Sequence, residues 1–430
     1  MPHRAHAIVT DTTRCIGCIT CSKACPTKAI RVRDNVAEVD DELCIDCGTC
    51  MEVCRREAMR PRTSSPADLK KFAYTVALPS LTLYAQFGRE FHPGQVLHAL
   101  RGLGFDETYD ISWMCEMVMG ATDAYLSEAT DPWPKISVTC PALVRLVQIR
   151  YPDLIPHLVP IETPRELAAK LRRRRIAAER GLDPSEIGMF LITPCTALSH
   201  SIVAPMGLEA SHLDGVFSIA EMYGPILKSM REDPGSDPVD TVSVRGLRWA
   251  MAGGEIAGMR NANSMTVRGL QDVIYVFDRI EAGTFQNVDF IEAYICPDGC
   301  VSGGLTVVGR YTAQRNLQDA YRLLGDQATV KEEKVRSLLR EHFFDLEAEI
   351  RARPVRPLAP DLREAIALKR EKDALLKRLA GKGCAACGAP DCETLADDIV
   401  RGKAQLTDCV FVRLAALEKA QSAPQRGRHD

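Results

Sequence analysis

The sequence contains no apolar run near the ~20 residues that a membrane-spanning helix needs, and the N-terminal stretch Met1–His6 has no apolar signal core. It also lacks an excess of basic residues. The formal net charge at pH 7 is −3, so no global positive field indicates a nucleic-acid partner. We therefore expect a cytoplasmic protein with no membrane span. With 430 residues, of which 46% are hydrophobic, roughly two to four domains with their own cores are expected.

Cysteine, in contrast, is abundant, with 17 residues. In a secreted protein this number would suggest disulfide bonds. Here the spacing of the cysteines is that of metal-ligand motifs, which a reducing cytoplasm favours.

The first cysteine group lies within residues 13–54 and repeats the spacing C-x2-C-x2-C-x3-C twice, as in bacterial two-cluster ferredoxins. In that arrangement the fourth cysteine of each run ligates the other cluster. One 4Fe-4S cluster is therefore assigned to Cys15, Cys18, Cys21 and Cys54, and a second to Cys44, Cys47, Cys50 and Cys25. A zinc-binding module is the alternative, but zinc sites pair C-x2-C knuckles and do not need two tetrads.

A second cysteine group follows three runs of strand character in the middle of the chain. The run 288–295 ends on Cys296, and Cys300 follows in a turn rich in glycine, where Gly299 would let the backbone approach a cluster closely. The runs 136–139 and 189–194 end on Cys140 and Cys195. Ligands of open α/β sheets sit beyond the carboxyl ends of the strands, so these four cysteines can meet at one point. Four reduced core cysteines are the alternative.

This triple pattern resembles the three cysteine motifs of the iron-only (FeFe) hydrogenases, which read roughly TSCCPxW, MPCxxKK and ACPGGCxGGGQ. The corresponding stretches here are 138–143, 193–199 and 295–305. The flanking stretches 97–106 and 150–154 also look like the family, and the likeness spans about Lys70–Tyr321. The resemblance implies that Cys140, Cys195, Cys296 and Cys300 hold a 4Fe-4S cluster. It also places Cys300 where true hydrogenases bridge to a two-iron subsite.

The sequence departs from the family at the residues that would serve this subsite. Thr139 replaces a proton-carrying cysteine, and Leu198 replaces a lysine that donates to a cyanide ligand, a charge-assisted hydrogen bond of roughly 1.5–3 kcal/mol. Gly120 and Ala121 stand where the family has a pair of glutamates that carry protons. Leu305-Thr306 also replaces the final Gly-Gln of the last motif. These changes predict the loss of the proton route and of the polar holder of the two-iron unit.

Four residues are candidates for a replacement catalytic role: Thr139, Cys115, Glu116 and His200. Cys115 and Glu116 would offer a shifted proton route, whereas the plain interpretation is a partly buried cysteine and a helix-surface glutamate. His200 has a suitable unperturbed pKa for proton transfer, against the interpretation of a surface or capping histidine. Separately, the run Arg172–Arg175 lies in a predicted helix, Pro164–Arg180, and is interpreted as a solvated face or a docking patch for an acidic partner.

The third cysteine group, Cys384-x2-Cys387-x4-Cys392-x16-Cys409, looks like the small four-cysteine 4Fe-4S domain found in corrinoid iron–sulfur proteins and some hydrogenase-like proteins. A structural zinc site is the alternative. The three groups account for every cysteine except Cys115.

The predicted architecture is a multi-domain α/β chain. It has a ferredoxin-like α+β dicluster module (1–62), a hydrogenase-like α/β domain with two sheets flanking the cluster site (63–350), a linker and helix (351–380), a small helical 4Fe-4S domain (381–415) and a disordered tail (416–430).

Three functions remain open: an electron-transfer protein with a degenerate hydrogen site, a hydrogen or redox sensor, and an active ferredoxin-linked hydrogenase. The expected cofactors are two N-terminal, one central and one C-terminal 4Fe-4S cluster, with a two-iron subsite as an open question. The expected partners are redox proteins, either a ferredoxin, a flavoprotein or a signalling protein. A sensor would usually add a signalling module, for which no chain length remains.

Overall fold

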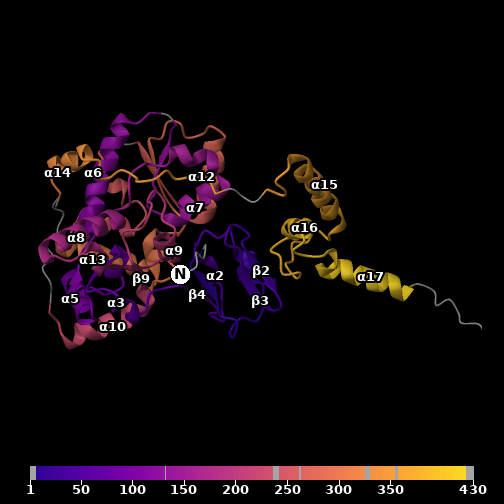
Figure 1. The fold of residues 1–430 in the computed structure, drawn as a ribbon, viewed down its shortest axis with the longest axis horizontal. Coiled ribbons are helices and arrows are strands. Elements are labelled where there is room, and N and C mark those ends of the chain that lie inside the picture. The colour runs from indigo at the N-terminus through magenta and orange to yellow at the C-terminus, as the bar shows by residue number, and fades with distance from the viewer. Residues whose placement is uncertain are drawn as a thin grey trace, which may run out of the picture. The chain divides into compact units, whose positions relative to one another are not determined.

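The computed structural model describes residues 6–130, 132–235, 242–260, 263–324, 330–353 and 357–422 (Figure 1). The chain divides into two compact units. Unit 1 comprises Met1–Ala7, Ile45–Gly48 and Pro61–Ala352, and unit 2 comprises Ile8–Cys44, Thr49–Arg60 and Arg353–Asp430. The short segment Ile45–Gly48, predicted as part of the N-terminal module, thus groups with the large α/β domain.

The larger sheet of unit 1 is parallel throughout and has the strand order β6-β5-β8-β9. Its strands are β5 (Tyr74–Pro79), β6 (Glu107–Thr108), β8 (Ile187–Thr193) and β9 (Gly215–Ser218). The two central strands are buried along their whole length, as parallel strands covered on both faces are. β8 corresponds to the predicted apolar run 189–194.

A second parallel sheet has the order β10-β11-β7, with β10 (Ser264–Arg268), β11 (Phe290–Tyr294) and β7 (Lys135–Ile136). The predicted α/β fold with two sheets is therefore confirmed. β7 is shorter than the predicted strand 136–139. After Ser137 the backbone N–H of Thr139 turns to the Ser137 side-chain oxygen, at 3.2 Å, instead of to a neighbouring strand.

Helices separate the strands of unit 1. Four of them position the site: α6 (Ser112–Glu128), α7 (Pro141–Arg150), α8 (Pro164–Arg180) and α9 (Thr196–Val203). α7 and α8 begin with proline, which is preorganised for the first helical turn, and α8 has the predicted bounds. The others are α3 (Pro66–Leu69), α4 (Leu81–Tyr84), α5 (Pro93–Gly102), α10 (Ile219–Glu232), α11 (Val244–Leu247), α12 (Leu270–Glu281), α13 (Arg310–Leu324) and α14 (Glu332–Arg340).

Unit 2 contains the ferredoxin-like module and the C-terminal cysteine domain. The module has a hairpin, β2 (Ile30–Arg33) and β3 (Val36–Val39), the strand pair β1 (Ile8–Thr10) and β4 (Met59–Pro61), and the short helices α1 (Thr20–Ala24) and α2 (Thr49–Glu52). The C-terminal part has α15 (Leu362–Arg378), α16 (Cys392–Val400) and α17 (Val410–Ser422). Each part packs its own small apolar core.

The predicted disordered tail is wrong over residues 416–422, which belong to α17. This helix is anchored where Phe411 and Val412 pack against the core of the C-terminal domain, and it continues past the predicted boundary. Residues 423–430 lie outside the described residues. Among the helices that the structure describes, none combines the length and the apolar character that crossing a bilayer requires.

Candidate functional site

The central site of unit 1 is built where strands end and helices begin. Cys140 and Cys195 are the residues directly before α7 and α9, and Cys195 follows the carboxyl end of β8. The backbone N–H of Cys195 donates to the Thr193 hydroxyl at 3.2 Å, which fixes the turn from strand to helix. Cys296 and Cys300 follow β11. The ends of both sheets thus deliver cysteines to one place.

These cysteines line one chamber, which encloses about 780 Å³ including its open mouth. All four predicted residues are among its lining: Cys140, Cys195, Cys296 and Cys300. Within the described ranges, no three His, Cys, Asp or Glu side chains are placed to hold a single metal ion. In a 4Fe-4S cluster each thiolate takes a different iron, so the donors surround the cluster from its corners.

Burial controls the chemistry of these thiols. It raises the pKa of Cys195 to about 12, helped by the neighbouring Cys140, and it also raises the pKa values of Cys140 and Cys300. Without a metal, these thiols would therefore be neutral at pH 7. Iron binds thiolate and offsets the cost of burying its charge, so four partly buried thiols around one chamber fit an iron–sulfur cluster.

The rest of the chamber wall is mainly apolar. It includes Leu81, Ile111, Leu191 and Trp249, and also Leu198, which is 8% exposed. Thr139 lines the chamber as well. Two of the positions at which the sequence departs from the hydrogenase motifs therefore face the same space as the cysteines.

Cys115 and Gly299 also line the chamber. Cys115, on α6, lines the chamber and is buried, with a pKa raised well above its usual value by burial. Gly299 has φ +78°, and a Cβ on it would lie 2.5 Å from the Ala252 backbone nitrogen. Gly299 is thus needed for close packing of two backbone segments, which the sequence did not predict.

The interpretations of Glu116 and His200 as surface residues are wrong. Glu116 is 7% exposed and accepts a hydrogen bond from the Ser243 hydroxyl at 2.6 Å. His200 is 1% exposed within α9. Neither is among the residues that line the cysteine chamber. The run Arg172–Arg175 does not present four free charges. Arg172 pairs with Glu107 and Arg173 pairs with Asp214, whereas the other two arginines are exposed.

A buried pair of carboxyl groups beside the chamber was missed from the sequence. Glu255 and Glu292 are 3% and 0% exposed. The Ser137 hydroxyl donates to Glu255 at 2.7 Å, and the backbone N–H of Glu255 donates to the Glu292 carboxylate at 3.3 Å. Burial raises both pKa values, and the charge of Glu292 raises that of Glu255 further. The sequence feature that could have indicated this pair is Glu292, a charged residue within the apolar run of β11.

Arg165 was also missed. It is 9% exposed, lines the chamber and donates to the Thr139 carbonyl oxygen at 3.3 Å. Its positive charge lowers the pKa values of Cys140 and Cys300 against the effect of burial. Arg165 therefore places a cation beside the thiols.

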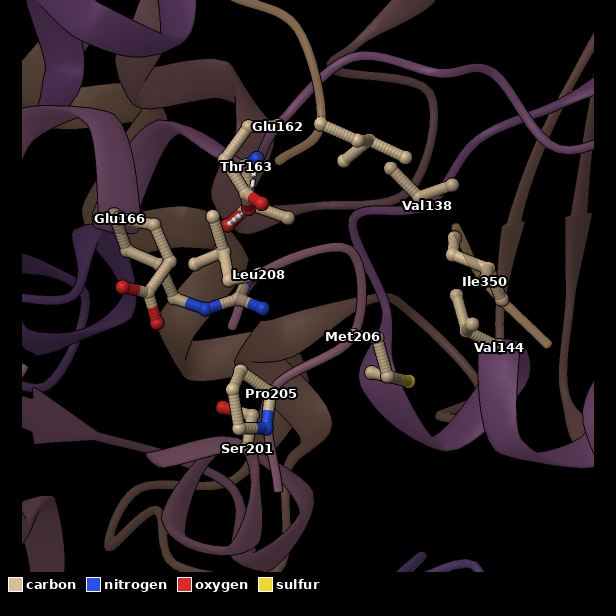
Figure 2. A pocket seen from close by; sticks show the side chains of 12 residues that line it. Val138, Val144, Glu162, Thr163, Glu166, Ser201, Pro205, Met206, Leu208 and Ile350 are labelled. Carbon is tan, nitrogen blue, oxygen red and sulfur yellow. Dashed lines mark hydrogen bonds between the residues drawn. The ribbon is translucent and has the colours of Figure 1, made fainter. Parts of the chain in front are cut away.

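Arg165 also lines a neighbouring pocket of about 360 Å³. Figure 2 shows this pocket with Glu162, Thr163 and Glu166 on one side and the apolar Met206 and Ile350 on the other. The pKa of Glu162 is raised to about 7, mainly by burial. This acidic, half-apolar pocket contains no cysteine.

In unit 2, two of the predicted cysteine tetrads each line a pocket. The first contains the predicted crossover set Cys15, Cys18, Cys21 and Cys54. The other contains Cys384, Cys387, Cys392 and Cys409. Backbone N–H groups of Ala37 and Ala58 donate to the sulfur atoms of Cys15 and Cys54 at 3.4 and 3.3 Å. Such donors stabilise thiolate ligands and tune cluster potentials.

The remaining tetrad comprises Cys25, Cys44, Cys47 and Cys50. In unit 2, Cys44 and Cys50 are each 8% exposed, and the Ala29 N–H donates to the Cys25 sulfur at 3.2 Å. Cys47 belongs to the segment Ile45–Gly48 of unit 1. Ligation of clusters by all these cysteines stays a prediction.

Comparison with known families matches three parts of the chain. Residues 73–228 and 215–304 match the family described as "Iron only hydrogenase large subunit, C-terminal domain". Residues 7–55 match "4Fe-4S dicluster domain", and residues 379–411 match "Putative Fe-S cluster". The matches thus include all three predicted cysteine groups.

Curated relatives are distant. The periplasmic [Fe] hydrogenase large subunit of Nitratidesulfovibrio vulgaris is 25% identical over 368 residues, covering 70% of this chain and 87% of the relative. Iron hydrogenase 1 of Clostridium pasteurianum is 24% identical over 260 residues, covering 49% and 45%. The cytosolic Fe-S cluster assembly factor nar1 of Aspergillus terreus is 31% identical over 112 residues, covering 23% and 19%.

Among solved structures, a glutamate-to-alanine variant of the [FeFe]-hydrogenase HydA1 from Chlamydomonas reinhardtii has a TM-score of 0.51 and 18% identity. The match covers 67% of this chain and 98% of that chain. At this identity the likeness concerns the fold. The family match over more than half of the sequence carries the assignment: the chain belongs to the iron-only hydrogenase large-subunit family.

Proposed function

We propose that this protein is an electron-transfer member of its family, in which the central chamber holds a 4Fe-4S cluster but the hydrogen-activating two-iron unit has lost its support. The observation that carries the proposal is the position of Leu198 and Thr139 on the chamber wall. An aliphatic side chain gives no hydrogen bond to an anionic ligand, and a hydroxyl is a far weaker acid than a thiol.

A bound 4Fe-4S cluster supplies one-electron transfer. The residues of this chain would then act in three ways. The chamber cysteines provide thiolates, Arg165 balances part of their charge, and the apolar wall keeps water away from the cluster. Each of these factors sets a reduction potential without requiring an open coordination position.

The contacts of the segment Ile45–Gly48 are a further argument for an electron-transfer role of the chamber. The Thr196 hydroxyl donates to the Asp46 carbonyl oxygen at 2.6 Å, and Asp46 pairs with Arg145 of α7. Thr196 follows Cys195, and Cys47 follows Asp46. A predicted ligand of the second ferredoxin-type cluster is thus tied by short contacts to the element that carries a predicted ligand of the central cluster.

Hydrogen sensing or turnover is the second candidate function, and Cys115 favours it. This thiol lines the chamber and is the remaining cysteine outside the four tetrads, so it can offer a proton in place of the residue lost at Thr139. The relative named as an Fe-S cluster assembly factor, in contrast, is consistent with a role of the fold outside hydrogen chemistry.

The deciding experiment is infrared spectroscopy of protein purified without oxygen after co-expression with hydrogenase maturation factors. The proposal predicts no bands from metal-bound CO or cyanide and about sixteen iron atoms per chain, four for each cluster. Cys195→Ala serves as a matched variant and should lose about four of them. Bands from both ligands in the wild type would overturn the proposal in favour of hydrogen chemistry.

A further inference from the structure

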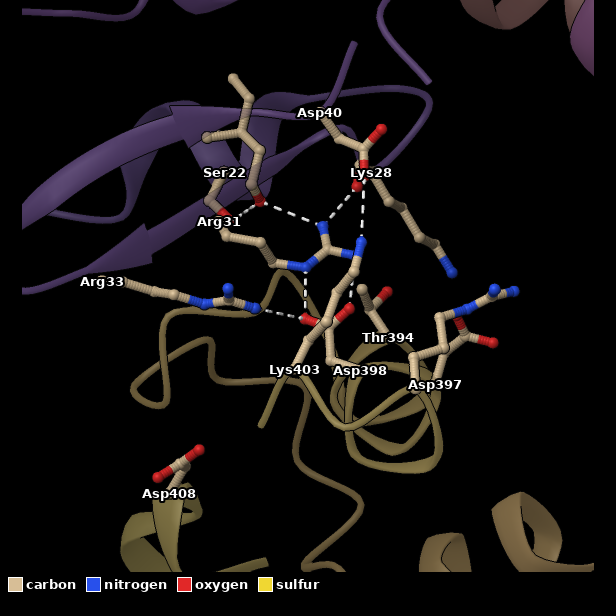
Figure 3. Close-up of polar contacts among 12 residues, drawn as sticks. Ser22, Lys28, Arg31, Arg33, Asp40, Thr394, Asp397, Asp398, Lys403 and Asp408 are labelled. Carbon is tan, nitrogen blue, oxygen red and sulfur yellow. Dashed lines mark hydrogen bonds and ion pairs between the residues drawn. The ribbon is translucent and has the colours of Figure 1, made fainter. Parts of the chain in front are cut away.

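Within unit 2, the C-terminal cysteine domain is held against the β2–β3 hairpin of the ferredoxin-like module by a charged contact. The Arg31 guanidinium donates to both carboxylate oxygens of Asp398, at 2.6 and 3.1 Å. The two side chains are only 12% and 6% exposed. Figure 3 shows Arg33 reaching the same carboxylate, at 3.4 Å. A bidentate pair shielded from water fixes orientation as well as position.

Further contacts surround this pair. Lys28 lies 2.9 Å from Asp391 and 3.3 Å from Glu393, both on the C-terminal side. The backbone N–H of Val32 donates to the Gly388 carbonyl oxygen at 2.8 Å. Gly388 has φ +84°, and a Cβ there would lie 1.8 Å from the Val32 carbonyl oxygen. The two backbones therefore approach as closely as only glycine permits.

This backbone contact joins the walls of two cysteine pockets. Val32 lines the pocket that contains Cys15, Cys18, Cys21 and Cys54. Gly388 directly follows Cys387, which lines the pocket that contains the C-terminal tetrad. One hydrogen bond and one peptide unit thus connect the wall of one pocket to a cysteine of the other. Electron tunnelling is favoured by short routes through covalent and hydrogen bonds, because its rate falls steeply across gaps.

We propose that the C-terminal cluster and the cluster held by Cys15, Cys18, Cys21 and Cys54 form an electron-exchanging pair, docked through Arg31 and Asp398. One electron leaves one cluster, which is oxidised, and enters the other, which is reduced; no bond forms or breaks. The inference rests on the proposed electron-transfer function and names the immediate redox partner of the C-terminal domain, which is the ferredoxin-like module of the same chain.

The test is electron paramagnetic resonance of the full-length holoprotein reduced with dithionite. Two reduced clusters that lie close together interact magnetically, so the wild type should show broadened or split signals. Arg31→Glu, which places a carboxylate against Asp398, should remove the part of this splitting that comes from the C-terminal cluster, with an unchanged iron count. Arg31→Glu combined with Asp398→Arg should restore the interaction, because the more exposed Arg33 can turn toward solvent.

Asp397→Asn is the matched control. Asp397 lies beside Asp398 on α16 but pairs with Arg401 and Lys372 of the C-terminal part, so the interaction should persist. The inference fails if the wild-type clusters show no interaction, if Arg31→Glu leaves it intact, or if the C-terminal domain holds zinc. Infrared bands from CO and cyanide would instead overturn the proposed function without contradicting the inferred cluster pair.

Discussion

The Arg145 guanidinium donates to the Asp46 carboxylate at 2.9 Å, and both side chains are fully buried. Asp46 also accepts from the backbone N–H of Ala7 at 2.7 Å. The pair connects helix α7, which begins directly after Cys140, to the segment that carries Cys47. A buried ion pair of this kind is costly to break, because the remaining charge has no water to solvate it.

Asp46→Ala should therefore destabilise unit 1 by about 3–5 kcal/mol. Urea unfolding under anaerobic conditions measures the change. Asp373→Ala removes an exposed pair with Lys369, in which the side chains are 58% and 51% exposed, and should cost less than about 1 kcal/mol. Equal effects of the two substitutions would contradict the structural role of Asp46.

The carboxyl pair Glu255 and Glu292 should make stability depend on pH. Burial and the neighbouring carboxylate raise the pKa of Glu255 to about 8, so between about pH 5 and pH 8 the folded state holds a proton that the unfolded state releases. Stability due to this group is present at low pH and is lost as the pH rises toward 8. Glu255→Gln should reduce the slope of the unfolding free energy against pH by about 1 kcal/mol per pH unit.

This pH prediction is checked by unfolding curves at several pH values. Glu349→Gln is the control, because the Glu349 side chain is 84% exposed. If the Glu255→Gln variant keeps the wild-type dependence of unfolding free energy on pH, another group binds the proton.

Arg165→Met should make the central cluster harder to reduce. Removing a nearby cation disfavours the added electron, and an interaction of about 1 kcal/mol corresponds to a potential about 40 mV lower. A redox titration followed by electron paramagnetic resonance measures the shift. Arg174→Met, an exposed position on the same helix, should leave the potential unchanged. A shift of the same size in both variants would mean that long-range charge, and not Arg165 itself, sets the potential.

Cys409→Ala should lower the iron content by about four atoms per chain, because Cys409 lines the C-terminal pocket with three other cysteines. Metal analysis of purified protein distinguishes this from the zinc alternative, which predicts the loss of about one zinc and no iron. Cys115→Ala also removes a buried thiol but lies outside the tetrads, so its iron content should equal that of the wild type.

The sequence by itself determined the family, the α/β class and the grouping of the cysteines. Metal-ligand spacing is local along the chain in the two terminal groups, so it can be recognised without a fold. The central strands were also predictable, because strands buried on both faces are continuously apolar, as in Ile187–Thr193.

The tertiary structure alone decided which other groups lie in or beside the chamber. Arg165 and Glu255 lie far from the cysteines in sequence, and nothing in their local pattern marks them as neighbours of Thr139. Glu116 and His200 are buried although the sequence favours surface positions for them, because a single polar residue in a helix does not reveal which side the rest of the chain covers. Likewise, the contact between Arg31 and Asp398 joins residues 367 positions apart, and only packing brings such charges together.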